Sequence, residues 1–207
     1  MKKIMLLLSL WVIIGMELFY LQSKAVSSLS EEVKIDEFGM YMELFDSIFE
    51  ELQCFPVVKE ASMKDYPVEF EDSWGAERTY GGKRTHEGCD LMAIDHERGT
   101  LKVCSMTDGK VRSIGWLDQG GWRIGIESDS GVYYYYAHLD SYEKAFEKGE
   151  RVVAGQILGR MGDSGYGKEP GTKGNFPVHL HVGIYVKDFE GKERAINPYW
   201  YLKQLEI

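Results

Sequence analysis

The sequence predicts a mainly β fold, an antiparallel sheet or sandwich that is preceded by an N-terminal amphipathic helix. After Pro56, glycines become frequent and short β-branched or aromatic runs alternate with turn residues, as in a compact antiparallel β domain. Before Pro56, apolar residues recur at helical spacing. The 207 residues, 44% of them hydrophobic and 28% charged, are enough to bury one sizeable core.

Residues 1–25 have the pattern of a signal peptide or signal anchor. Lys2 and Lys3 precede an apolar stretch of thirteen residues, Ile4 to Met16, and Ser23-Lys24-Ala25 supplies small residues of the kind that a signal peptidase recognises. The stretch is shorter than the roughly 20 residues that a membrane-spanning helix needs. The pattern predicts export to the cell envelope or the medium, with an uncleaved leader as the only expected contact with a membrane.

Residues 26–54 are predicted to form the amphipathic helical segment. Ser28 and Glu31 have the spacing of a capping box, and further apolar side chains widen the stripe, which favours packing on a domain surface over a coiled coil. Self-association is the second interpretation. The apolar residues at spacings of three and four are Ile35, Phe38, Met42, Phe45, Phe49 and Leu52.

The remainder, residues 55–207, is predicted to be one β domain. No repeat of solenoid type interrupts it. The candidate strands are Gly109 to Ile114, Trp122 to Ser128, Val132 to His138, Gln156 to Met161 and Val178 to Val186.

Charge and cysteine content exclude several classes of protein. The formal net charge is -9, which argues against nucleic acid as a partner, because phosphate binding needs clustered Lys and Arg. Cys54, Cys89 and Cys104 contain no CxxC pair, so neither a zinc ribbon nor a disulfide framework is indicated. One disulfide is an open alternative, but three small semi-buried hydrophobic side chains are the favoured interpretation.

The segment His179-Leu180-His181 places two imidazoles on one face of a predicted strand. Residues two apart in a strand point to the same side, so Leu180 points to the opposite, apolar side. Two convergent imidazoles suit a metal site, although a solvated strand face can also carry two histidines.

The second cluster is His86-Glu87-Gly88-Cys89-Asp90. A zinc-binding helix with ligands four residues apart is rejected here, because the glycines of this segment give it poor helix propensity. In an extended strand His86 and Asp90 would lie roughly 13 Å apart, so a bend is needed, and Gly88 can supply it. Two histidines and one aspartate would leave the fourth position of a zinc ion open, as in catalytic sites.

Together these segments resemble the lysostaphin-type zinc metalloendopeptidases, which are LytM-like peptidoglycan hydrolases. The resemblance covers roughly Phe55 to Leu202 and implies that residues 55–207 form a lysostaphin-type catalytic domain. The segments that occur in the family's order are His86 with Asp90, Tyr136-Ala137-His138-Leu139, Lys148 to Gln156, Gly162-Asp163-Ser164-Gly165, His179-Leu180-His181 and the closing Asn197 to Leu202.

The resemblance implies residue roles. His86, Asp90 and His181 match the ligands of one Zn²⁺ ion, and His138 and His179 match the two histidines that flank the catalytic water. Tyr80 matches a tyrosine that contacts the tetrahedral intermediate, with a half-buried turn aromatic as the equal alternative.

Other residues near these segments carry weaker expectations. Tyr136, in the run Tyr133 to Tyr136, is expected to flank the substrate groove. His96 and Glu87 match no family role and are expected to be solvated. The loop from Tyr166 to Pro177 is longer than in the small enzymes of the family, so substrate preference carries over poorly.

The function that the resemblance implies is zinc-dependent hydrolysis of peptide bonds in peptidoglycan stem peptides or cross-bridges. The expected partner is a peptidoglycan peptide, and an envelope protein is a second partner that the location allows. The alternative is a non-catalytic envelope scaffold or an activator of another wall hydrolase. Degenerate relatives of that kind lack one or more metal ligands, and this chain lacks none.

Overall fold

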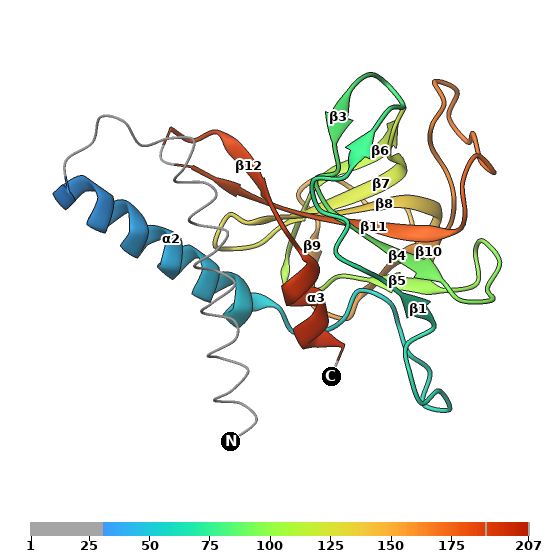
Figure 1. The fold of residues 1–207 in the computed structure, drawn as a ribbon. Helices are drawn as coiled ribbons and strands as arrows, with labels where there is room; N and C mark the ends of the chain where they lie inside the picture. The colour runs from blue at the N-terminus through green and yellow to red at the C-terminus, as the bar shows by residue number, and fades with distance from the viewer. Residues whose placement is uncertain (1–30, 189, 207) are drawn as a thin grey trace. The chain divides into compact units, whose positions relative to one another are not determined.

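The main structural feature is an antiparallel sheet of ten strands, shown in the computed structural model of Figure 1. The structure describes residues 31–188 and 190–206. The mainly β fold predicted from the sequence is confirmed. In order, the central path of the sheet contains β1 (Val68–Glu69), β4 (Cys89–Ala93), β11 (His179–Lys187), β8 (Tyr133–Tyr142), β7 (Gly121–Glu127), β6 (Gly109–Leu117) and β9 (Arg151–Val152).

Five further strands complete the β structure. In the same sheet, β10 (Ile157–Met161) pairs with β8 and with β5 (Lys102–Cys104), and β12 (Glu193–Ile196) pairs with β11. A separate hairpin joins β2 (Glu77–Arg78) to β3 (Arg84–Thr85). The five candidate strands correspond to β6, β7, β8, β10 and β11, with ends that differ by a few residues. Most of the strands that were not predicted have only two to four residues, too few to show an alternating pattern.

The helix predicted within residues 26–54 is α2 (Glu31–Glu51). It is amphipathic where side chains are described, since Phe45 and Ile48 are buried whereas Glu43, Asp46 and Glu50 are exposed. The predicted capping residue Ser28 and the leader, residues 1–25, lie outside the described residues. Within residues 31–188 and 190–206, no helix has both the length and the apolar character that a membrane crossing requires.

One compact unit carries the sheet and spans Ile48–Ile207. It therefore includes the last turn of α2, in addition to the domain that was expected over residues 55–207. Inside this unit, α3 (Tyr199–Leu205) packs next to that turn through the rings of Phe49 and Tyr201, whose centroids are 4.4 Å apart.

The core of the unit is built by alternate residues of the central strands. Tyr134, Tyr136, Ile124 and Leu180 are completely buried, and their neighbours along each strand point to the opposite face, as a pleated strand requires. The hydroxyl of Tyr136 accepts a hydrogen bond from the backbone N–H of Met106 at 2.9 Å. A buried polar group without a partner is unfavourable, and this bond removes that cost.

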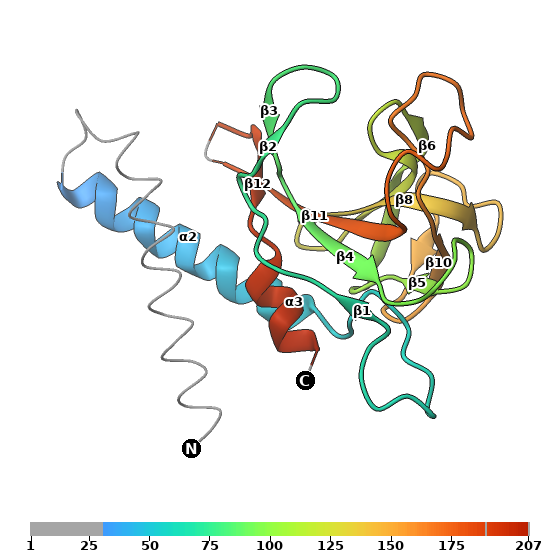
Figure 2. The same ribbon diagram turned by 45° about the vertical axis from the view of Figure 1, so that its right-hand side comes forward.

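Two excursions from the sheet approach each other on the side opposite the core. The β2–β3 hairpin and the loop between β10 and β11 both rise on this side in the two views (Figures 1 and 2). The ring of Tyr80, in the turn of the hairpin, stacks on the ring of Tyr166, near the start of the loop, with centroids 4.5 Å apart and planes 3° from parallel. The two excursions therefore border one region of the sheet.

Candidate metal centre and catalytic groove

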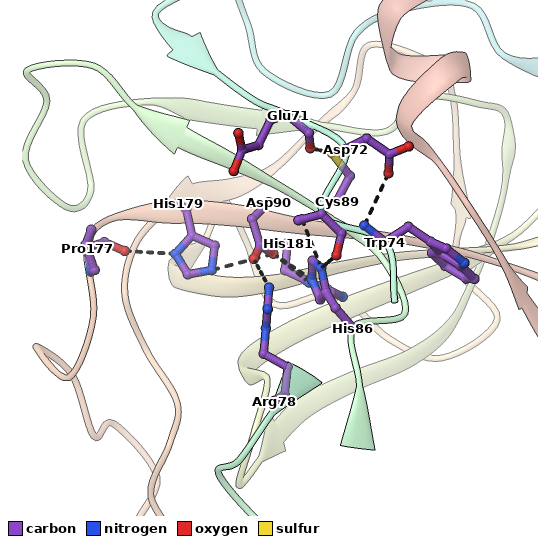
Figure 3. Close-up of polar contacts among 11 residues, drawn as sticks. Glu71, Asp72, Trp74, Arg78, His86, Cys89, Asp90, Pro177, His179 and His181 are labelled. Carbon is purple, nitrogen blue, oxygen red and sulfur yellow. Dashed lines mark hydrogen bonds and ion pairs between the residues drawn. The ribbon is translucent and has the colours of Figure 1, made fainter. Parts of the chain in front are cut away.

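Three potential metal ligands converge where the neighbouring strands β4 and β11 pair. Asp90 of β4 lies directly opposite His181 of β11 in the antiparallel register, and His86 precedes β4 in the loop that follows β3. Asp90 Oδ1 lies 2.8 Å from His181 Nδ1 and 3.1 Å from His86 Nε2, and the two nitrogens are 3.0 Å apart (Figure 3). The structure thus brings together the three residues that the sequence proposed as ligands.

The donor atoms fit a single zinc ion. Donors bound to a tetrahedral zinc at about 2.0 to 2.1 Å lie about 3.3 Å from one another, and the separations of 2.8 to 3.1 Å come close to that value. Two neighbouring imidazole nitrogens can share at most one proton, so a cation is the partner that satisfies both lone pairs. Nitrogen and carboxylate oxygen are ligands that zinc accepts.

Asp90 is held in its ionised form. Burial raises the pKa of its carboxyl, but the contacts with the imidazoles of His181 and His86 outweigh burial and hold this pKa well below its usual range. The guanidinium of Arg78 donates to the second oxygen, Oδ2, at 3.1 Å. Because Arg78 occupies Oδ2, Oδ1 is the oxygen that faces the histidines (Figure 3).

The orientation of His86 is fixed by a backbone carbonyl. Its Nδ1 lies 3.1 Å from the carbonyl oxygen of Ser73 and 3.0 Å from the Ser73 hydroxyl. Since a carbonyl only accepts, Nδ1 carries the proton and Nε2 keeps the lone pair that a metal needs. Outer contacts of this type orient metal-binding histidines in general.

His138 reaches the groove because β8 contains a β-bulge. Tyr136 of β8 pairs with Ile124 of β7, and Leu139 pairs with Trp122. Two residues of β8 therefore lie opposite one residue of β7 between these pairs. Within this bulge His138 has a φ of 63°, in the left-handed region that residues other than glycine seldom adopt. Bulges next to active sites redirect side chains in this way. Here the bulge places both Ala137 and His138 on the groove side.

His138 and His179 present the same atom to the groove. Nδ1 of His138 donates to the carbonyl of Ser164 at 2.8 Å, and Nδ1 of His179 donates to the carbonyl of Pro177 at 2.8 Å. In both rings Nε2 is therefore left as an acceptor. The ring centroids are 4.6 Å apart.

Both of these histidines are neutral bases. Burial, followed by the neighbouring His179 and His181, lowers the pKa of His138 well below its ordinary value. Burial also lowers the pKa of His179, more than Asp90 raises it. Each Nε2 can therefore accept a proton at neutral pH.

A groove of about 700 Å³ contains the metal ligands and both neutral histidines. The expectation that Tyr136 flanks this groove is wrong, because Tyr136 is completely buried and belongs to the core. Four tyrosines line the groove, Tyr133, Tyr135, Tyr166 and Tyr185. The bulge explains the error, since it breaks the two-residue alternation that would otherwise put Tyr136 and His138 on the same face.

The structure does not bring Tyr80 into this cluster. Tyr80 lies in the turn after β2, is half-buried and stacks on Tyr166, so its role at the tetrahedral intermediate stays a prediction. Glu87 is exposed at the rim of the groove, and His96 lies in a loop where its Nδ1 contacts the carbonyl of Ile94.

Sequence reasoning missed several residues that shape the site. Arg78 orients Asp90, as described above. Tyr166 and Phe176 come from the long loop, and the Phe176 ring packs edge-on against His138 and His179, with centroids 4.7 and 5.1 Å away. Only the length of the loop was a signal in the sequence.

Gly88 lies at the expected bend between His86 and Asp90, and it has a second function. A Cβ at this position would lie 2.4 Å from Cε1 of His181 and 2.7 Å from the carbonyl oxygen of Val182, closer than non-bonded atoms approach. The absence of a side chain therefore allows β4 to approach the imidazole of His181.

Replacing Gly88 with alanine is expected to weaken zinc binding by about 10- to 100-fold, the usual effect of disturbing a contact that orients a metal ligand. The reason is that the new methyl group must displace the His181 ring. Competition with a colorimetric chelator measures the affinity. Gly39→Ala is the control, since its Cβ meets no atom within 4 Å, and equal affinity in both variants would contradict this account.

An antiparallel sheet that carries a His-Asp-His donor set beside two neutral histidines defines a candidate metallohydrolase. Comparison with known proteins gives the family: the model of Peptidase family M23 matches residues 84–198. This match covers more than half of the chain, and the chain belongs to that family.

Three relatives illustrate the similarity. The L-Ala--D-Glu endopeptidase of Bacillus subtilis (strain 168) is 37% identical over 193 residues, 93% of this chain and 54% of that protein. The LytM protein of Ruminococcus gnavus ATCC 29149 is 48% identical, with a TM-score of 0.73 over 82% of this chain and 66% of its own. For the lysostaphin catalytic domain of Staphylococcus simulans the identity is 28% and the TM-score 0.50, over 66% and 92%. The chain thus spans about half the length of its Bacillus relative and has the lysostaphin-type fold.

Proposed function

We propose that the protein is an exported, zinc-dependent endopeptidase that hydrolyses a peptide bond of peptidoglycan. The observation that carries the proposal is the convergence, in one groove, of three metal-ligand atoms and two uncharged Nε2 acceptors. Zinc bound by His86, Asp90 and His181 would supply a Lewis acid that polarises the scissile carbonyl and activates water.

His138 and His179 supply the proton transfers. One Nε2 accepts a proton from the attacking water, and the resulting imidazolium returns a proton to the amine that leaves. The Nδ1–H bonds to Ser164 and Pro177 hold both rings in the orientation and tautomer that this requires. The Nε2 of a histidine can donate to the oxyanion only when the ring is protonated. Because the pKa of both rings is lowered, both are neutral before the reaction begins, and a ring becomes a donor only after it has accepted a proton during the reaction.

The substrate that we propose within the wall rests on the similarity to a relative that matches 93% of this chain. That protein is an L-Ala--D-Glu endopeptidase, and the similarity supports the stem peptide, at its alanyl-glutamyl bond, as the substrate here. The leader predicted over residues 1–25 would bring the enzyme to this substrate outside the cytoplasm.

The zinc-loaded chain is expected to release peptide fragments from purified cell walls, and mass spectrometry of these fragments identifies the bond that is cut. Fragments ending in alanine and beginning with glutamate would support the stem-peptide assignment, whereas cuts only in the cross-bridge would reject it. The scaffold alternative would replace the proposal if zinc-loaded protein bound wall or partner protein but released no fragment.

A further inference from the structure

Arginines gather in the groove of a protein that is acidic as a whole. Four of the eight arginines of the chain line it, although the formal net charge is -9. They are Arg78, Arg84, Arg112 and Arg123.

Two of these arginines are already neutralised. Arg78 pairs with Asp90, and Arg112 pairs with Glu193 and, at 3.3 Å, with Glu127. These two guanidinium groups are therefore held by carboxylates of the protein.

Arg123 is different, because its guanidinium has no partner among the described residues. It makes neither a hydrogen bond nor an ion pair within residues 31–188 and 190–206, and its Nη1 is buried. Arg84 also lacks an ion pair with any residue that the structure describes, but its Nε donates to the carbonyl of Tyr80. Buried polar groups are normally paired, and buried charges almost always are. Arg123 is half-buried and lines the groove, so an unpaired guanidinium at this position indicates that the missing anion comes from the ligand.

The position of Arg123 relates this anion site to the bond that is cut. On β7, Arg123 lies opposite the bulge of β8 that contains Ala137 and His138, and Ala137 pairs with His181 on β11. Neighbouring strands are about 4.8 Å apart, so the backbone at Arg123 lies about 10 Å from that at His181. An extended peptide advances about 3.3 Å per residue. An anion bound by Arg123 therefore belongs to the substrate residue next to the scissile bond or to the residue after that one.

We propose that Arg123 binds a free carboxylate of the peptide substrate and so selects an acidic wall peptide over an uncharged one. A glutamyl residue within a peptide keeps one free carboxylate, because only one of its two carboxyl groups enters the chain, whereas a glycine cross-bridge offers none. The planar guanidinium can hold both carboxylate oxygens at once. This inference rests on the proposed function and specifies the substrate of the same site.

The test compares two peptides that differ in one group: L-Ala-γ-D-Glu-L-Lys-D-Ala with the free α-carboxylate of glutamate, and the same peptide with that carboxylate converted to an amide. The zinc-loaded wild-type chain is expected to cleave the acid with a kcat/KM about 10- to 100-fold above that of the amide, the range of a charge-assisted hydrogen bond. Arg123→Met should reduce this ratio to about one while cleavage of the amide persists. Arg123→Lys, which keeps the charge and loses the planar geometry, should give an intermediate ratio.

Arg112→Met is the matched control, because it removes an arginine from the same groove whose charge is already neutralised, and it should keep the full preference for the acid. A ratio near one in the wild-type chain would overturn the inference, as would loss of the preference in Arg84→Met but not in Arg123→Met. Thermal unfolding of each variant shows whether the fold is retained.

Equilibrium binding separates this inference from the proposed function. Titration calorimetry of both peptides into the zinc-loaded His138→Ala chain, with and without Arg123→Met, reports recognition without cleavage. Preference for the acid that depends on Arg123 supports the inference even if the wild-type chain cleaves neither peptide, which would reject the proposed activity. Cleavage without such a preference would leave the activity standing and overturn the inference.

Discussion

Replacing His181 with alanine is expected to remove both stoichiometric zinc binding and wall hydrolysis. His181 supplies one of three donor atoms within 3.1 Å of one another, and two ligands hold zinc far less well than three. A bound metal contributes several kcal/mol to transition-state stabilisation, so kcat/KM should decrease by about 10³-fold or more. Zinc content by elemental analysis and release of wall peptides are the two measurements.

The matched control for this experiment is His96→Ala, because His96 is the one histidine of the chain outside the groove. Its zinc content and activity should equal those of the wild type. A chelator should abolish wild-type activity, and added zinc should restore it. Activity that survives both chelation and His181→Ala would reject a zinc mechanism.

Replacing His138 with alanine is expected to lower kcat/KM by about 10²- to 10⁴-fold, the range for general acid-base catalysis, while one zinc per chain is retained. In contrast to His181, His138 is not among the three converging ligands, and its Nε2 is free to move protons. The His179→Ala variant, measured in parallel, shows which of the two rings makes the larger contribution. Loss of zinc in His138→Ala would show that the assignment of ligand and base is wrong.

The pH dependence of wall hydrolysis by the wild-type protein tests the same assignment. A base loses activity as it becomes protonated, and the pKa of His138 is lowered by its burial. The acidic limb of kcat/KM should therefore lie below pH 6.5, the ordinary pKa of histidine. Zinc content is determined at each pH so that loss of metal is not mistaken for protonation.

The sequence was sufficient to predict features that depend on local periodicity. The spacing of His179 and His181 required both rings to lie on one face, and the structure places them there, with Leu180 in the core. The rejection of a helix at His86 is likewise confirmed, since the segment runs from strand β3 through a short loop to β4.

Features that depend on pairing between distant strands could not be predicted from residue types. The register that sets Asp90 opposite His181 joins positions 91 residues apart. The error at Tyr136 has the same origin. Strict alternation would place Tyr136 and His138 on one face of the strand, but the bulge at His138 turns its side chain to the opposite face. The bend predicted at Gly88 is confirmed, but the close approach of Gly88 to the His181 imidazole could not be predicted, because that ring lies on another strand.

The tyrosine run of β8 also determines how this protein can change. Its core and groove positions are interleaved along the strand: Tyr134 and Tyr136 are fully buried, whereas Tyr133 and Tyr135 line the groove. A combinatorial library limited to Tyr133, Tyr135 and Arg123 would therefore vary the surface that meets the peptide and leave the packed face untouched. The fold thus allows the groove surface to diversify separately from folding stability.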